Sequence, residues 1–103
     1  MLAELTIFPI DKGISVSSYV KKAIEYIKNE SEKRSLKYEL NSMGTNIEGE
    51  FDDVWDIIIN SHKIMRKYSD RIYIIIKIDD RKGVKNAIIE KRKSIEDKLK
   101  NSY

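Results

Sequence analysis

The stretch RIYIIIKIDD, residues 71–80, is the feature that most restricts the fold of this chain. Ile72, Ile74, Ile76 and Ile78 stand at every second position, so in an extended strand these four side chains project from one face. The other face mixes aromatic, aliphatic, basic and acidic side chains, which are Tyr73, Ile75, Lys77 and Asp79. This pattern predicts a sheet with one face covered by helices and a second face in a different environment.

The rest of the chain supplies the partners of this strand. Further strands are predicted at 2–10, 36–43 and 45–51. Helices are predicted from about residue 15 to 34, from 52 to 70, and after Gly83. The order is therefore β-α-β-β-α-β followed by a terminal helix. Right-handed crossovers place both middle helices on one face of an antiparallel sheet whose first and third strands are central. We expect an α+β, ferredoxin-like fold that forms one domain over residues 1–103.

The terminal segment has an amphipathic pattern of its own. Its apolar stripe predicts an ordered helix that needs a partner surface. Residues from Arg81 onward carry a net charge of +5, but acidic residues interrupt the basic ones at helical spacing. A solvated helix face is therefore favoured over a nucleic-acid-binding tail. The stripe consists of Val84, Ile88, Ile95 and Leu99.

Composition removes several classes of function. The chain has no cysteine, so disulfides, thiolate metal sites and a cysteine nucleophile are excluded. With His62 as the single histidine, no ligand cluster for zinc is present and no metal site is predicted. The N-terminal segment lacks a basic region and is interrupted by Pro9, so neither a signal peptide nor a membrane span is predicted. We expect a cytoplasmic protein.

The uncovered face of the predicted sheet combines apolar and charged side chains. The apolar ones need a cover, and Glu48 and Lys77 are costly to cover unless they are paired or bound. We therefore expect an oligomer whose subunits meet over this face and leave a small polar pocket there. The face consists of Glu4, Thr6, Phe8, Asn46, Glu48, Glu50, Tyr73, Ile75 and Lys77.

Three motifs resemble one family. They are P-x-x-x-x-I-S-V-S-x-Y-V at 9–20, M-G-T-x-I-E-G-E at 43–50 and R-x-Y-x-x-I-K-I-D-D-R at 71–81. Together they resemble the thiamine-binding protein family, whose small ferredoxin-like members are related to a tandem-domain protein that binds thiamine and hydroxymethylpyrimidine. The resemblance implies a homodimer or homotetramer that binds a ligand without catalysis and without a catalytic cofactor. The chain departs from the family at Asn46, where an apolar residue is usual, and in its Lys-rich terminal helix.

The resemblance implies thiamine or hydroxymethylpyrimidine as the ligand, in a role in thiamine salvage, transport or homeostasis. A carboxylate can accept from the amine of an aminopyrimidine, a threonine can donate or accept, and an aromatic ring can pack on the flat heterocycle. We therefore expect Glu48 and Thr45 to hold the pyrimidine in the covered pocket. A structural pair between Glu48 and Lys77 is the alternative. The full predicted ligand set is Thr45, Glu48, Asn46, Lys77, Phe8 and Tyr73.

Other functions use the same topology. RNA-recognition motifs stack bases on strand aromatics, but the acidic residues of this sheet face should repel phosphate, so no nucleic-acid partner is expected. An enzyme would need a placed general base with partners, and no such constellation is visible. A regulatory domain that binds amino acids, or a purely structural oligomer, is the nearest alternative to thiamine binding.

Overall fold

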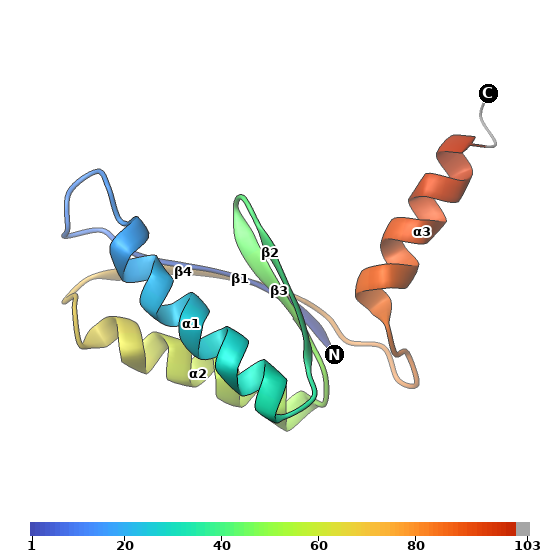
Figure 1. Ribbon diagram of the computed structural model, residues 1–103, viewed down its shortest axis with the longest axis horizontal. Coiled ribbons are helices and arrows are strands. Elements are labelled where there is room, and N and C mark those ends of the chain that lie inside the picture. Colours follow the sequence, from blue (N-terminus) through green and yellow to red (C-terminus); the bar gives the residue numbers. More distant parts are fainter. Residues whose placement is uncertain (101–103) are drawn as a thin grey trace.

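The computed structural model, which describes residues 1–100, has the predicted order of elements (Figure 1). The ferredoxin-like α+β class predicted from the sequence is confirmed. Strand boundaries differ from the predicted ones by a few residues at the β-hairpin. The elements are β1 (Leu2–Pro9), α1 (Ser17–Lys33), β2 (Lys37–Asn41), β3 (Gly44–Glu48), α2 (Phe51–Arg66), β4 (Ile72–Asp79) and α3 (Ala87–Lys100).

The four strands form one antiparallel sheet in the order β2-β3-β1-β4. The first and third strands are therefore central, as predicted. The register places Leu5 of β1 between Thr45 of β3 and Ile76 of β4. Because side chains alternate along a strand, these three residues project from the same face of the sheet.

The core lies between this face and the helices α1 and α2 (Figure 1). Alternate residues of β1 are buried, which is the pattern of a strand with one covered face. The helices contribute apolar residues at helical spacing, so each helix buries one stripe. The buried core residues are Ala3, Leu5, Ile7, Ala23, Ile27, Ile47, Val54, Ile57, Ile58 and Met65.

A cluster of charges ties the end of α1 to the start of α2. Arg34 follows α1, and its guanidinium donates to Glu30 at 3.2 Å, to Asp53 at 3.1 Å and to Asp56 at 2.5 Å. The hydrogen bond to Asp56 is the largest of the effects that raise the pKa of Arg34 above its ordinary value. The two helices are therefore joined by charge-assisted bonds at one end of the helical layer.

Gly49 lies just after β3, where the chain bends toward α2. A Cβ atom on Gly49 would come within 1.9 Å of Leu36 Cδ2, a distance that no real Cβ atom shows. The bare Cα therefore lets Leu36, just before β2, pack over the end of β3. The close approach at Gly49 is therefore made by another segment of the same chain.

The terminal helix α3 lies on the opposite side of the sheet from α1 and α2 and extends away from the body (Figure 1). Its first residue, Ala87, is buried, whereas nearly all of the helix beyond it is exposed. The helix predicted from the sequence is present. The partner surface that its apolar stripe requires is not supplied within the residues that the structure describes.

Candidate functional site

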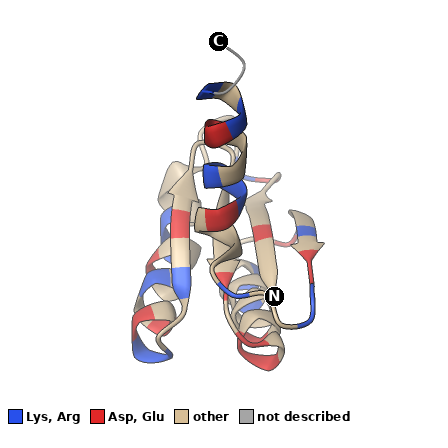
Figure 2. Ribbon diagram, turned by 90° about the vertical axis from the view of Figure 1, so that its right-hand side faces the viewer, with Lys and Arg blue, Asp and Glu red and all other residues tan. Residues whose placement is uncertain are grey.

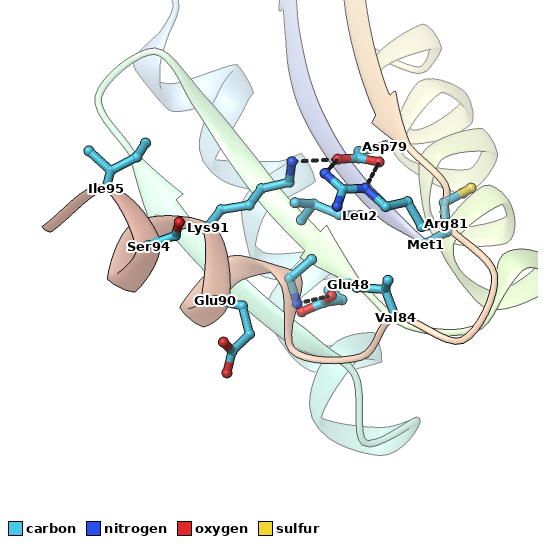
Figure 3. Close-up of a pocket in the computed structure, with 11 residues that line it drawn as sticks. Met1, Leu2, Glu48, Asp79, Arg81, Val84, Glu90, Lys91, Ser94 and Ile95 are labelled. Atoms are coloured by element: carbon cyan, nitrogen blue, oxygen red, sulfur yellow. Dashed lines mark hydrogen bonds and ion pairs between the residues drawn. The ribbon is translucent and has the colours of Figure 1, made fainter. Parts of the chain in front are cut away.

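Glu48, the last residue of β3, is buried, with 6% of its surface exposed. Its carboxylate accepts a hydrogen bond from the backbone N–H of Ala87 at 2.5 Å (Figure 3). It accepts a second one from the backbone N–H of Ile88 at 3.3 Å. These are the first two residues of α3, whose amides have no partner within the helix. A carboxylate at this position also interacts favourably with the positive end of the helix dipole. Glu48 therefore fastens α3 to the sheet.

The predicted alternative for Glu48, an ion pair with Lys77, is not formed within the chain. The register places Lys77 opposite Glu4, and their charged atoms lie 3.8 Å apart. Glu48 lies instead beside Leu2 on β1 and Lys37 on β2. The two predicted partners are separated because they occupy different rows of the sheet.

Thr45 and Glu48 do not share a pocket, so the predicted site that combined them is wrong in its geometry. Residues 45 and 48 differ by an odd number of positions along an extended strand, and side chains at such a spacing project from opposite faces. Thr45 lies on the helical side beside Leu5, whereas Glu48 lies on the side of α3. The same alternation, applied to Thr45 with Ile47, could have identified this from the sequence.

A groove of about 320 Å³ opens where Thr45 lies. It runs between the first half of α1 and the sheet, and the turn between β2 and β3 closes one end of it. Its walls are mostly apolar, and among the described residues no charged side chain lines it. The principal lining residues are Leu5, Phe8, Val16, Val20, Ile24, Leu40, Met43 and Thr45.

Thr45 contributes the most enclosed polar side chain of this groove. The residue is only 4% exposed, and its hydroxyl forms no hydrogen bond with any residue that the structure describes. Thr6, by contrast, has its hydroxyl occupied, because it donates to the carbonyl oxygen of Met43 at 2.7 Å. Buried polar groups in proteins nearly always have a partner. The hydroxyl of Thr45 is therefore available to a molecule in the groove.

A second cavity, of about 380 Å³, lies between α3 and the adjacent ends of the strands (Figure 3). Asp79, at the end of β4, pairs there with Lys91 of α3 and with Arg81 at 3.3 Å. The hydrogen bond from Lys91, and then that from Arg81, holds the pKa of Asp79 below its ordinary value. Glu48 also lines this cavity, but its carboxylate already accepts hydrogen bonds from the backbone of α3.

The other four predicted site residues all belong to the open face of the sheet. Phe8 and Tyr73 lie opposite each other on the open face, with ring centroids 5.5 Å apart, and Phe8 also reaches the groove. Asn46 and Lys77 flank Glu4 on the open face. Of the six predicted residues, only Thr45 and Phe8 line the groove. Other lining residues, such as Val16 and Val20 at the start of α1, could not be distinguished from core residues in the sequence.

Residues 1–100 show neither a cluster of metal ligands nor a membrane-spanning helix. No group of three or more potential metal ligands is brought together among these residues. Within the same part of the chain, no helix has the length and apolar character needed to cross a membrane.

The fold and the groove define a ferredoxin-like α+β domain with a neutral, largely apolar groove beneath its first helix. The chain belongs to the thiamine-binding protein family, whose sequence profile matches residues 3–96. This confirms the resemblance found in the three sequence motifs.

Relatives in several organisms match almost the whole chain. UPF0045 protein MJ1052 of Methanocaldococcus jannaschii is 43% identical over 95 residues, which cover 92% of this chain and 91% of the relative. A UPF0045 protein of Methanothermobacter thermautotrophicus is 35% identical over 100 residues, which cover 94% of this chain and 97% of the relative. The crystal structure of MJ1052 superposes with a TM-score of 0.80 at 42% identity and covers 91% of this chain and 93% of that one.

A more distant structure shares the fold. It is the crystal structure of TM0486 from Thermotoga maritima, a putative thiamine biosynthesis/salvage protein. The TM-score is 0.72 at 20% identity, and the match covers 88% of this chain and 96% of that one.

Proposed function

We propose that this protein binds thiamine or a related aminopyrimidine, without catalysis, in the groove between α1 and the sheet. The observation that carries the proposal is Thr45, a residue only 4% exposed that lines a neutral apolar groove and whose hydroxyl forms no hydrogen bond with the described residues. Membership of the thiamine-binding protein family supports the choice of ligand. The groove has the volume of a small-molecule site at the lower end of the usual range.

The chemistry of an aminopyrimidine suits this groove. Its ring is flat and largely apolar, and it presents an amine donor beside ring-nitrogen acceptors. Thr45 can donate to a ring nitrogen or accept from the amine, because a hydroxyl has both capacities. Apolar side chains of the lining, such as Leu5 and Val20, can pack against the ring.

The neutral lining also argues against the rival functions. An amino acid would bring both a positive and a negative charge into an apolar groove, where neither finds an opposite charge, and desolvating them is costly. The described lining offers no titratable side chain, so it supplies no general acid or base for a reaction. These features favour binding of an uncharged aminopyrimidine ring over amino-acid sensing and over catalysis. The cationic thiazolium ring of thiamine would lie outside the apolar lining. A role in thiamine salvage, transport or homeostasis follows from such binding.

Assembly into a homodimer or homotetramer is part of this proposal. The groove lies on the helical side of the sheet, and α3 lies on the other side (Figure 1). A second copy that covers the open face would therefore leave the groove accessible. Ligand binding and assembly are accordingly measurable as separate properties.

Titration calorimetry with thiamine and with hydroxymethylpyrimidine tests the site. Wild-type protein should bind at least one of them, and Thr45→Val should weaken that binding roughly tenfold, since one hydrogen bond is worth about 1–1.5 kcal/mol. Valine has nearly the shape of threonine, and the lost hydroxyl has no partner in the protein. The folded state should therefore be no less stable in the variant.

Two variants serve as controls. Thr6→Val removes a hydroxyl that already donates to the carbonyl oxygen of Met43. Glu48→Gln alters the opposite face of the sheet. Neither should change the affinity more than about twofold. The proposal fails if folded wild-type protein binds neither compound at millimolar concentration, or if Thr45→Val binds as tightly as wild type.

A further inference from the structure

The first turn of α1 forms part of the wall of the groove. Val16, the residue before the helix, and Val20, one turn into it, both line the cavity of about 320 Å³. Thr45 of β3 lines the same cavity from the sheet. The N-terminus of a 17-residue helix therefore lies at the mouth of the groove.

Two backbone amides of this first turn have no hydrogen-bond partner among the described residues. Tyr19 and Val20 both donate their N–H groups to the carbonyl oxygen of Val16, each at 3.0 Å. The N–H groups of Ser17 and Ser18 come before them, and no backbone carbonyl of the preceding loop accepts from either one. Such orphan amides are satisfied by a side chain, by water or by a ligand.

No side chain satisfies these amides either. The N-cap residue is Val16, which has no acceptor in its side chain, and the first turn carries no acidic residue. The hydroxyl groups of Ser15, Ser17 and Ser18 form no hydrogen bond with the residues that the structure describes. This end of α1 therefore presents both amides and hydroxyls as free donors.

The charge around this end of α1 is positive. Residues 10–22 contain three lysines and one acidic residue, Asp11. The Asp11 carboxylate is already engaged, because it accepts from the hydroxyl of Ser69 at 2.5 Å and from the N–H of Asp70 at 3.0 Å. The positive end of the helix dipole adds to the lysines. An anion at the mouth of the groove is therefore favoured electrostatically.

The interior of the groove gives an independent indication of a ligand. Thr45 is only 4% exposed, and its hydroxyl has no hydrogen-bond partner in residues 1–100. Among these residues, only Ser31 has a buried side-chain oxygen that lacks both a partner and contact with open space. The hydroxyl oxygen of Thr45 therefore keeps contact with the space of the groove that it lines.

We propose that the groove takes its aminopyrimidine as a phosphate monoester, with the ring beside Thr45 and the phosphate at the N-terminus of α1. This assignment rests on the proposed function, which places the ring, and it adds the chemical class of the ligand. A phosphate monoester carries a charge of about −1.5 to −2 near neutral pH and three acceptor oxygens. A helix N-terminus is suited to such a group, because its amides and its dipole act together.

The division between a neutral interior and a basic mouth favours an ester over either part alone. The phosphate stays outside the apolar lining, since removing its charge from water inside the groove would be costly. Inorganic phosphate meets only the exposed helix end, and the unphosphorylated ring meets only the groove. A ligand that carries both groups satisfies the hydroxyl of Thr45 and the amides of Ser17 and Ser18 at the same time.

Titration calorimetry at constant ionic strength compares hydroxymethylpyrimidine, its phosphate monoester and inorganic phosphate. Wild-type protein should bind the monoester at least tenfold more tightly than either of the other two. Equal affinity for the monoester and hydroxymethylpyrimidine overturns the phosphate site and leaves the proposed function standing. Inorganic phosphate that binds as tightly as the monoester also overturns it, because the groove then has no part in binding. Failure of both pyrimidines to bind overturns the phosphate site and the proposed function together.

Ser18→Glu places a negative charge in the first turn of α1. The ratio of monoester affinity to hydroxymethylpyrimidine affinity should fall at least tenfold, because only the phosphate meets the new charge. A glutamate in the first turn favours the helix, so the melting temperature should not fall. Thr45→Val should instead weaken both pyrimidines about tenfold and leave their ratio unchanged.

Ser94→Glu is the matched control for Ser18→Glu. Ser94 is exposed on α3, on the other side of the sheet from the groove. Basic and acidic residues are already interspersed along this helix (Figure 2), so a further glutamate should be tolerated there. Both affinities should remain within about twofold of wild type. A ratio that is unchanged in folded Ser18→Glu, or that falls equally in Ser94→Glu, overturns the phosphate site.

Amide NMR spectra locate the phosphate on the chain. Saturation with the monoester should shift the N–H signals of Ser17 and Ser18, whereas hydroxymethylpyrimidine should move them much less. The amide of Ala87 at the start of α3 is the internal control, because Glu48 already accepts its hydrogen bond. Equal shifts of Ser17 and Ser18 with both compounds, or shifts confined to α3, would contradict the position given to the phosphate.

Discussion

The carboxylate of Glu48, at the end of β3, accepts a hydrogen bond from the backbone N–H of Ala87, 39 residues later, at 2.5 Å. A strand of the sheet thereby supplies the cap that the first turn of α3 lacks. Together with the ion pairs of Lys91 and Arg92, this bond determines where the terminal helix leaves the body. The residue that the sequence marked as a ligand group thus has a structural role in this chain.

Glu48→Gln should loosen α3 while leaving the groove intact. The neutral amide loses the interaction of a negative charge with the helix N-terminus, which is worth about 1 kcal/mol in a partly buried setting. Amide hydrogen exchange at Ala87 and Ile88 should accelerate several-fold, and denaturant unfolding should give a lower free energy of unfolding. Glu50→Gln, at an exposed position nearby, is the control. Unaltered exchange at both amides would contradict the role given to Glu48.

Arg34→Lys should lower the melting temperature, although the charge is conserved. Arg34 contacts three carboxylates with separate nitrogen atoms, and a lysine cannot reproduce this planar set of donors. Lys33→Ala is the control, because Lys33 is largely exposed and its distance to Glu30 is 3.9 Å. Calorimetric scans should show a larger decrease for Arg34→Lys than for the control. Equal melting temperatures would mean that the cluster does not hold the two helices together.

Gly49→Ala should destabilise the protein by about 1–3 kcal/mol, the usual cost of overpacking. The added methyl group would overlap Leu36 Cδ2. A double-mutant cycle with Leu36→Ala checks the cause, since removal of the obstructing side chain should recover part of the loss. Strictly additive effects in denaturant unfolding would show that the clash with Leu36 is not responsible.

Acid should weaken the protein through two aspartates. The hydrogen bond from Ser69 holds the pKa of Asp11 below its ordinary value, and those from Lys91 and Arg81 do the same for Asp79. The unfolded chain therefore binds protons more readily than the folded one. The stabilisation is fully present above the unfolded value near 3.8 and is lost as the pH falls further through the folded values.

The free energy of unfolding, measured from pH 7 to pH 3, should accordingly decline at the acid end. Asp79→Asn and Asp11→Asn should each flatten that decline, because neither side chain then titrates. Asp52→Asn, at an exposed position in the first turn of α2, should leave its steepness unchanged. An acid limb of identical steepness in wild type and in both aspartate variants would argue against this origin.

The order of elements and the choice of the buried face were predictable because they depend on local periodicity. Alternation in LAELTIFPI and RIYIIIKIDD defined two strands, and spacing of three and four residues defined the helices. The central positions of β1 and β3 then followed from the handedness of crossovers. The family followed from three motifs that stand in the same order along the chain.

The sequence by itself determined the fold and the side of the sheet on which each strand residue lies, because both follow from repeats of two and of three to four residues along the chain. Only the tertiary structure decided what those side chains meet. Glu48 caps a helix 39 residues away, Lys77 pairs with Glu4, and the hydroxyl of Thr45 has no partner in its groove. The physical reason is that such partners come from elements far apart in the sequence, and their contacts are settled by register and packing rather than by local pattern.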